Sequence, residues 1–221
     1  MRKLIAILLM ICCLVPIVSC SSRDTTLTFI GHASLKIVSK NGTVIYIDPA
    51  YYDYDYEDKA DLILVTHRHD DHAKCSKCEL KSDGVYMNNT DTLVDGEYKT
   101  FTEKGIKIEA VPAGGNLNHD VRYCVGYIIT VDDIVIYHAG DTSKLDSMSD
   151  LKSKNIDYAF YPIDGVYNMD AVEATEVAEM VGAKHNIPIH DFNLVGEDKA
   201  VNFTPSGKLV MEYGETIVLS K

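Results

Sequence analysis

The chain lacks the short motifs that mark three large classes of enzyme. Its 221 residues contain no GxSxG, no GxGxxG, and no GxxxxGK followed by Ser or Thr. The first motif presents a serine nucleophile, the second binds a dinucleotide and the third cradles phosphates. We therefore expect none of these three kinds of site.

Positive charge is also scarce. The chain has 21 Lys and Arg residues against 33 Asp and Glu, which gives a net charge of -12 at pH 7. After the first twenty residues the arginines are Arg23, Arg68 and Arg122, too few to predict an anion-binding cluster. The acidic balance argues against nucleic acid as a partner. It does not exclude a phosphate substrate, because a bound metal ion can reverse the local field.

Cysteines are few after residue 20 and odd in number. Cys75, Cys78 and Cys124 cannot form a complete disulfide framework. The pair in CSKC has no second pair with which to build a zinc knuckle. We therefore predict free thiols or a local disulfide at this pair rather than a second metal site.

The first twenty residues differ in composition from the rest. Arg2 and Lys3 precede an apolar run over residues 4–18, and Ser19 stands just before Cys20. The run is shorter than the roughly 20 residues of a spanning helix, so it predicts an export signal. It resembles a bacterial lipoprotein signal, in which the cysteine is lipidated. An ordinary secretory signal or a membrane anchor is the alternative.

This resemblance predicts three parts of the chain. Residues 1–19 form the signal peptide, residues 20–25 a tether that begins at Cys20, and residues 26–221 one folded domain. The protein is then exported and anchored by its N-terminal lipid to the outer side of a bacterial membrane.

Strand patterns dominate the proposed domain. An apolar segment at 27–39 and another at 43–48 flank Asn41-Gly42, which is a β-hairpin signal. A second turn is predicted at Asp132-Asp133 between two strands within 123–139. Further strands are predicted at 62–65, 84–87, 106–113, 157–162 and 186–190, and a last strand pair within 208–220.

Helices are fewer. Residues 170–182 carry an apolar face, with Asp170 as N-cap, Glu173 in a capping box and Gly182 as the stop. A shorter helix is predicted within 72–81. The chain shows no internal linker and no repeat. These elements predict an α/β (α+β) domain of two sheets packed face to face, with helices outside.

The segment THRHDDH follows directly on the apolar DLILV. His67 and His69 are two residues apart, which on an extended backbone places both rings on one side. Asp71 and His72 lie beyond, where a turn redirects them toward a second metal. Imidazole and carboxylate ligands suit Zn, Fe or Mn. The alternative is a polar loop whose histidines face solvent.

Other candidate ligands also follow predicted strands. Asp141 comes after IVIY, His190 ends NIPIH, and His119 lies in a Gly/Asn-rich loop after residues 106–113. Loops at strand ends are where rigid scaffolds present functional side chains. The segment at 67–72 needs such additional ligands to complete two sites.

The order HxHxDH, His, GD and a C-terminal His resembles the metallo-β-lactamase superfamily. GHAS, YIDP, THRHDDH, VPA, YHAGDT and IPIH are similar to one branch of it. That branch includes L-ascorbate-6-phosphate lactonase, the N-acylphosphatidylethanolamine phospholipase D enzymes and many uncharacterised hydrolases. The resemblance covers Leu27 to Leu219. It implies a four-layer αββα sandwich with a two-metal site at one edge.

The resemblance also implies a set of ligands and catalytic groups. Two divalent ions are implied, zinc by preference, with Mn or Fe as alternatives. Asp71 and Asp141 would position the metal-activated hydroxide. The first metal is assigned to His67, His69 and His119, with His138 as a rival to His119; the second is assigned to Asp71, His72 and His190, and Asp141 bridges the two.

Four residues are candidates for support of the site or for its pocket. Asp48 either orients a metal-binding histidine or is a turn carboxylate before Pro49. His32 either lines the pocket or satisfies backbone groups. His138 is interpreted as a packing or supporting residue, and Tyr167 as a possible substrate contact. The tyrosine-rich loop at 51–59 is either a flap over substrate or a solvated acidic loop.

The predicted function is a metal-dependent hydrolase that acts on an ester, lactone or phosphodiester, with a small-molecule or lipid-like substrate. A second hypothesis is a lipid-anchored metal-binding module of the same fold without turnover. A third is a di-iron redox protein, a branch that usually carries a glutamate where this chain has His69.

Overall fold

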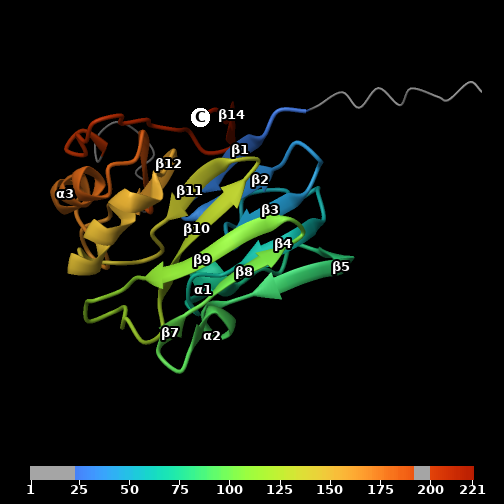
Figure 1. Ribbon diagram of the computed structural model, residues 1–221, viewed down its shortest axis with the longest axis horizontal. Coiled ribbons are helices and arrows are strands. Elements are labelled where there is room, and N and C mark those ends of the chain that lie inside the picture. The colour runs from blue at the N-terminus through green and yellow to red at the C-terminus, as the bar shows by residue number, and fades with distance from the viewer. Residues whose placement is uncertain (1–22, 192–199) are drawn as a thin grey trace, which may run out of the picture.

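The computed structural model describes residues 23–191 and 200–221 (Figure 1). The predicted signal peptide and Cys20 lie outside the described residues. Within the described part of the chain, no helix is both long enough and apolar enough to cross a membrane.

The first sheet has six strands in the order β14-β1-β2-β3-β4-β5. β14, β1, β2 and β3 pair antiparallel, whereas β3, β4 and β5 run parallel. Its strands are β1 (Thr26–Gly31), β2 (Ser34–Val38), β3 (Val44–Ile47), β4 (Ala60–Leu64), β5 (Leu80–Met87) and β14 (Glu215–Val218).

The second sheet also has six strands, in the order β13-β12-β11-β10-β9-β8. β8 to β11 pair antiparallel, and β11, β12 and β13 run parallel. Its strands are β8 (Thr100–Glu103), β9 (Ile106–Pro112), β10 (Val125–Val131), β11 (Ile134–His138), β12 (Tyr158–Pro162) and β13 (His185–Ile189). A small ribbon of β6 (Leu93–Val94) and β7 (Glu97–Tyr98) lies apart, after α2 (Asn89–Thr92).

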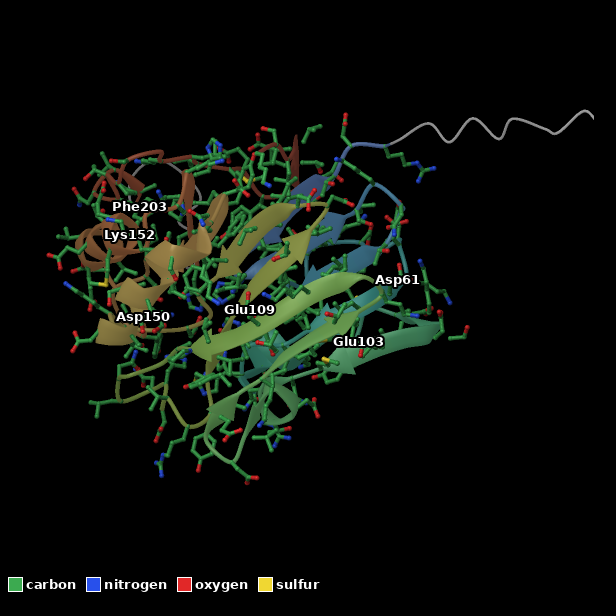
Figure 2. All side chains as sticks on the ribbon, viewed as in Figure 1. Asp61, Glu103, Glu109, Asp150, Lys152 and Phe203 are labelled. Carbon is green, nitrogen blue, oxygen red and sulfur yellow. The ribbon has the colours of Figure 1, made fainter. Side chains whose placement is uncertain are left out.

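The two sheets pack face to face through alternate residues of their strands. On β3, Ile45 and Ile47 enter the core between the sheets, while Val44 and Tyr46 pack on the outer side. Strands that are apolar on both faces are typical of buried layers. The outer side of the second sheet is covered by α3 (Ala171–Val181) and the 3₁₀ helix η1 (Asp146–Lys154). Phe203 joins this helical layer (Figure 2).

The outer side of the first sheet is covered differently. α1 (Asp70–Ala73) is a single turn, and most of the cover comes from the tyrosine-rich loop. Tyr54 and Tyr56 pack against each other, and Tyr56 packs on Tyr46 of β3. The αββα sandwich is therefore present, with a first helical layer reduced to one turn and an aromatic loop.

Four local predictions are corrected by the structure. The segment at 27–39 is two strands, β1 and β2, with His32 in the turn between them. The helix expected within 72–81 is only α1, which ends before the cysteines. The expected last strand pair is the single strand β14, which pairs with β1. Asp170 does cap α3, but Glu173 accepts the Lys144 N–H instead of completing a capping box.

The parallel strands decide where the site lies. β3 and β4 end near one edge of the first sheet, and β11, β12 and β13 end near the facing edge of the second. The loops after these strands carry the predicted polar residues. Ligand sites commonly form at the carboxyl ends of parallel strands, because their loops meet there.

Candidate metal centre

Asp48 holds both ends of the HxHxDH segment. It follows β3 and is fully buried. Its two carboxylate oxygens accept the N–H and the hydroxyl of Thr66, each at 2.7 Å. Its Oδ2 also lies 2.8 Å from His72 Nδ1. Asp48 therefore fixes the entry to the segment and the orientation of its last ring, as a carboxylate behind a metal-binding histidine does.

Three histidines form one group. His67 Nε2 lies 3.1 Å from His69 Nδ1, and His119 Nε2 lies 3.2 Å from the same atom. Bonds of 2.0–2.1 Å to a tetrahedral zinc would place the ligand nitrogens ~3.3 Å apart. The spacing of these ring nitrogens is therefore that of a metal-binding triad.

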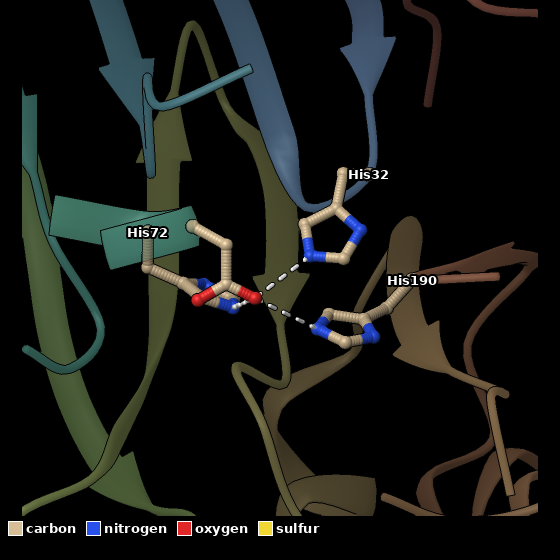
Figure 3. A group of neighbouring side chains, drawn as sticks. His32, His72 and His190 are labelled. Carbon is tan, nitrogen blue, oxygen red and sulfur yellow. Dashed lines mark hydrogen bonds and ion pairs between the residues drawn. The ribbon is translucent and has the colours of Figure 1, made fainter. Parts of the chain in front are cut away.

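A second group faces the first. His32, Asp71, His72 and His190 each bring one ligand atom within 4.8 Å of the others. Asp71 Oδ2 lies 3.9 Å from both His72 Nε2 and His190 Nε2, and 3.1 Å from His32 Nε2. Figure 3 shows the rings of His32, His72 and His190 pointing toward a common point.

Asp141 lies between the two groups. Its Oδ1 is 3.3 Å from His72 Nε2, and its Oδ2 is 3.2 Å from both His119 Nε2 and His190 Nε2. Gly140 allows this approach of the chain. Its φ is +65°, and a Cβ there would lie 2.6 Å from the Val125 carbonyl oxygen. A side chain at this position would displace Asp141.

Two buried atoms show that these residues fit a metal ion. His72 Nε2 and Asp141 Oδ1 are buried and have no hydrogen-bond partner, although they lie 3.3 Å apart. Buried polar atoms are normally hydrogen-bonded. A cation between an imidazole nitrogen and a carboxylate oxygen satisfies both atoms, and this donor set suits zinc, iron or manganese.

The pKa values of the site are strongly perturbed. Burial, with a smaller contribution from His72, lowers the pKa of His67 to about 3. Burial also opposes the charge on Asp141, but His72 and His190 outweigh it and hold the Asp141 pKa well below its usual range. In the same way Asp141 overcomes the burial of His190 and raises its pKa to about 9. Such coupled shifts are typical of functional sites.

Asp164 is a supporting residue that the sequence analysis missed. Its Oδ2 lies 3.0 Å from His190 Nδ1, and its Oδ1 accepts the N–H groups of Val166 and Tyr167. These contacts outweigh burial and lower the Asp164 pKa to about 2. The signal was present in the sequence, since the aspartate of PID comes just after β12 as the aspartate of YID comes just after β3.

The loop around His119 is held by backbone contacts. The His119 N–H donates to Asn116 Oδ1 (2.9 Å), and its carbonyl accepts the Gly115 N–H (2.7 Å). His119 Nδ1 lies 3.3 Å from the Tyr167 carbonyl oxygen. Tyr167 thus supports the ring through its backbone, while its side chain is 48% exposed beside the cavity.

His138 and His32 differ in their relation to the candidate ligands: His138 binds backbone groups, whereas His32 contacts the site. His138 Nε2 lies 2.9 Å from the Ala33 carbonyl oxygen, and its Nδ1 accepts the Gly140 N–H. It therefore ties β11 to the β1–β2 turn and stays out of the candidate ligand groups of the described chain. His32, in that turn, packs against His190, with ring centroids 3.9 Å apart and the ring planes tilted by 40°.

The structure thus brings together all seven residues predicted as ligands. Five of them, His69, Asp71, His119, Asp141 and His190, line an open cavity of about 540 Å³, together with Leu117, Asn118 and Tyr167. Cys75, Cys78 and Cys124 are free thiols, and burial raises the pKa of each to about 12.

Comparison with known proteins defines the class. The β-lactamase superfamily domain matches residues 26–190. A "UPF0173 metal-dependent hydrolase" from Thermococcus onnurineus is 32% identical over 185 residues, which cover 73% of this chain and 82% of that protein. The "UPF0173 metal-dependent hydrolase YtkL" of Bacillus subtilis is 29% identical and covers 87% of this chain and 99% of its own.

A solved structure agrees with these relatives. The crystal structure of a protein from Parabacteroides distasonis, described as a metal-dependent hydrolase, is 33% identical in sequence to this chain. The two folds superpose with a TM-score of 0.72, and the match covers 86% of this chain and 94% of that one. The protein is therefore a metal-dependent hydrolase with the metallo-β-lactamase fold. The chain belongs to the β-lactamase superfamily.

Proposed function

We propose that the chain hydrolyses an ester, lactone or phosphodiester with two divalent ions. His67, His69 and His119 would hold one ion, Asp71, His72 and His190 the other, and Asp141 would contact both. When bound, two such ions supply a water activated at neutral pH and stabilise charge on the substrate. The supporting observation is the position of Asp141, whose carboxylate lies 3.2–3.3 Å from histidines of both groups.

The residues of the chain have distinct tasks in this proposal. Asp141 is buried and ionised, so it balances positive charge at the centre. The Asp71 carboxylate is 49% exposed and lines the cavity, where it can accept a proton from an attacking water. Burial opposes its charge, but the hydrogen bond from His32 and the charge of His72 outweigh burial and lower the Asp71 pKa.

The imidazole and carboxylate donors favour zinc in this proposal, with manganese and iron as the alternatives. The test is to purify the protein and measure its metal content by mass spectrometry. Hydrolysis is then followed on a panel of esters, lactones and phosphodiesters. We expect about two equivalents of metal, and loss of both metal and activity in His67→Ala and His190→Ala.

His185→Ala is the matched control, since His185 lies on β13, stacks on Tyr158 and is outside the candidate ligand groups. A protein without metal and without activity after loading with Zn, Mn or Fe would defeat the proposal. Metal binding without turnover of any substrate would favour a binding module. An iron absorption band with redox activity would favour the di-iron alternative.

We also propose that the protein is exported and lipidated on Cys20, with a small-molecule or lipid-like substrate and no nucleic-acid partner. The support is the sequence of residues 1–20. Membrane fractionation and the mass of the mature N-terminus test it. Cys20→Ala should move the protein out of the membrane fraction, and an unmodified Cys20 in the native protein would contradict the proposal.

A further inference from the structure

A second cavity adjoins the metal centre on the side of the tyrosine-rich loop. Its volume is about 430 Å³, and Asp71 lines both this cavity and the one above the metal centre. His32 also lines it, and the ring of His32 packs against the ring of His190. Cavities of ~300–1,000 Å³ are typical of small-molecule sites. We name this second space the tyrosine cavity.

Aromatic side chains form one wall of the tyrosine cavity. Tyr51, Tyr52 and Tyr56 line it together with Pro49 and Ala50. The Tyr51 ring packs so closely on Gly31 that a Cβ there would lie 3.1 Å from it. The Tyr56 hydroxyl donates to the Tyr51 carbonyl oxygen at 3.1 Å. These contacts hold the wall in place without a substrate.

The opposite wall comes from the segment around α1. Lys77 Nζ donates to the Tyr52 carbonyl oxygen, which ties the two walls together at one side. The charged lining groups are two carboxylates, on Asp70 and Asp71, and two ammonium groups, on Lys74 and Lys77. Their charges balance, so the cavity offers no net attraction to an anion or to a cation. Its tyrosine wall favours an apolar or aromatic group.

We propose that the tyrosine cavity binds a neutral, apolar group of ring size in the substrate. The reacting ester or lactone bond then extends past Asp71 and His32 to the metal centre. In hydrolysis the oxygen of water bonds to the acyl carbon and gives up one proton, the bond from that carbon to the ester oxygen breaks, and the leaving oxygen takes up the proton that the water released. This inference rests on the proposed function and narrows its substrate class away from sugar phosphates.

The experiment compares two esters that differ only by a phenyl ring, methyl 3-phenylpropionate and methyl propionate. The readout is the ratio of their kcat/KM values. Ala50→Phe and Ser76→Phe fill the cavity from opposite walls, and Tyr123→Ala removes an exposed tyrosine outside both cavities. Loss of an apolar subsite typically lowers such a ratio about 10–100-fold. We expect this fall in at least one filling variant and no change in the control.

A binding measurement separates this inference from the proposed function. The probe is 4-phenylbutan-2-one, a non-hydrolysable ketone analogue of methyl 3-phenylpropionate. It is added to the metal-free protein, and its binding is followed by ligand-observed NMR. Binding that both filling variants abolish supports the cavity even if no ester is hydrolysed. Ester hydrolysis with a ratio unchanged in both folded filling variants, and no probe binding, overturns the inference and leaves the proposed function intact.

Discussion

The two sheets contribute to the metal centre in different ways. The first sheet supplies four candidate ligands from residues 67–72, a single segment after β4. The second sheet supplies His119, Asp141 and His190 from three separate loops. The first contribution is local and needs only one strand and one helical turn. The second depends on the complete sheet, because β9, β11 and β13 must be in register before their loops can meet.

Both sheets nevertheless use the same arrangement to orient a histidine ring, a carboxylate at its Nδ1 atom. Asp48, after β3, lies 2.8 Å from His72 Nδ1, and Asp164, after β12, lies 3.0 Å from His190 Nδ1. In each sheet, one histidine of the second group thus has its ring held by a carboxylate that follows the neighbouring strand. Asp48 also accepts two hydrogen bonds from Thr66, whereas Asp164 accepts the N–H groups of Val166 and Tyr167 in the exposed loop at 165–167. The comparison predicts unequal roles in stability and similar roles in metal binding.

The largest effect is expected at Asp141, where the two contributions meet. Asp141→Asn keeps the shape of the side chain and removes its charge beside His72, His119 and His190. We expect kcat/KM to fall about 10³-fold or more, because several kcal/mol of charge stabilisation are lost. Kinetics and metal analysis check this. Retention of full activity would show that Asp141 does not join the two groups.

Next in size are the two supporting carboxylates. Asp48→Asn and Asp164→Asn should each weaken metal affinity about 10–100-fold, the usual effect of a carboxylate behind a metal-binding histidine. Asp48→Asn should also lower the free energy of unfolding by about 1–3 kcal/mol more than Asp164→Asn, since the Asp48 oxygens also accept the buried N–H and hydroxyl of Thr66, whereas Asp164 binds the N–H groups of an exposed loop. Chelator competition and chemical denaturation measure the two effects. Equal losses of stability in both variants would contradict the unequal roles.

A smaller effect is expected from pH. Metal ligands must be deprotonated, and the metal-free pKa is about 9 for His190 but about 3 for His67. The affinity for a metal ion at the group that contains His190 should therefore rise between pH 6.5 and 9, about tenfold per pH unit for each proton that the ion displaces. The metal affinity of the group that contains His67 should change little over the same range.

The linkage to the stability of the metal-free protein has the opposite sign. His190 has a raised folded pKa, so its contribution to metal-free stability is present below pH 6.5 and is lost as the pH rises toward 9. Calorimetric titrations in buffers that differ in ionisation enthalpy count the protons that the protein releases when each metal ion binds. Equal proton release by both ions would contradict the prediction.

The smallest effect on the centre is expected at His138, which joins the sheets without facing the metal. His138→Leu leaves the Ala33 carbonyl oxygen and the Gly140 N–H without their present partner. We expect a loss of about 1–3 kcal/mol in unfolding free energy, the usual penalty for such groups. Metal content should remain unchanged. Loss of metal in a folded variant would place His138 within the centre.

Sequence patterns predicted the strands better than the short helices. The apolar runs of β3, β4, β11 and β12 are bounded by turns or polar residues, so the positions of these strands could be predicted from the sequence. Of the helix expected within 72–81, only residues 72 and 73 are helical, as the end of α1, and the chain then continues without a helix to β5. The tail at 208–220 gives one strand because its first half packs as irregular chain, with a single bridge from Lys208 to Asn186.

The candidate ligands were predicted because their residue types concentrate at strand ends. Asp164 escaped because a lone aspartate after a strand is also a common turn residue, and its partner His190 is remote in sequence. For His32 the sequence left two roles open, lining the pocket or satisfying backbone groups. Its approach to Asp71 depends on the β1–β2 turn, where its φ of +55° directs the ring into the site.

The sequence by itself determined the strands, the HxHxDH segment and the kind of donor atoms available, because these depend on local pattern and on side-chain chemistry. Only the tertiary structure decided which carboxylate holds which ring, which histidines stay outside the ligand groups, and where a second cavity opens. These features depend on contacts between residues far apart in the chain. Their distances are set by how two sheets pack rather than by the spacing of residues along one strand.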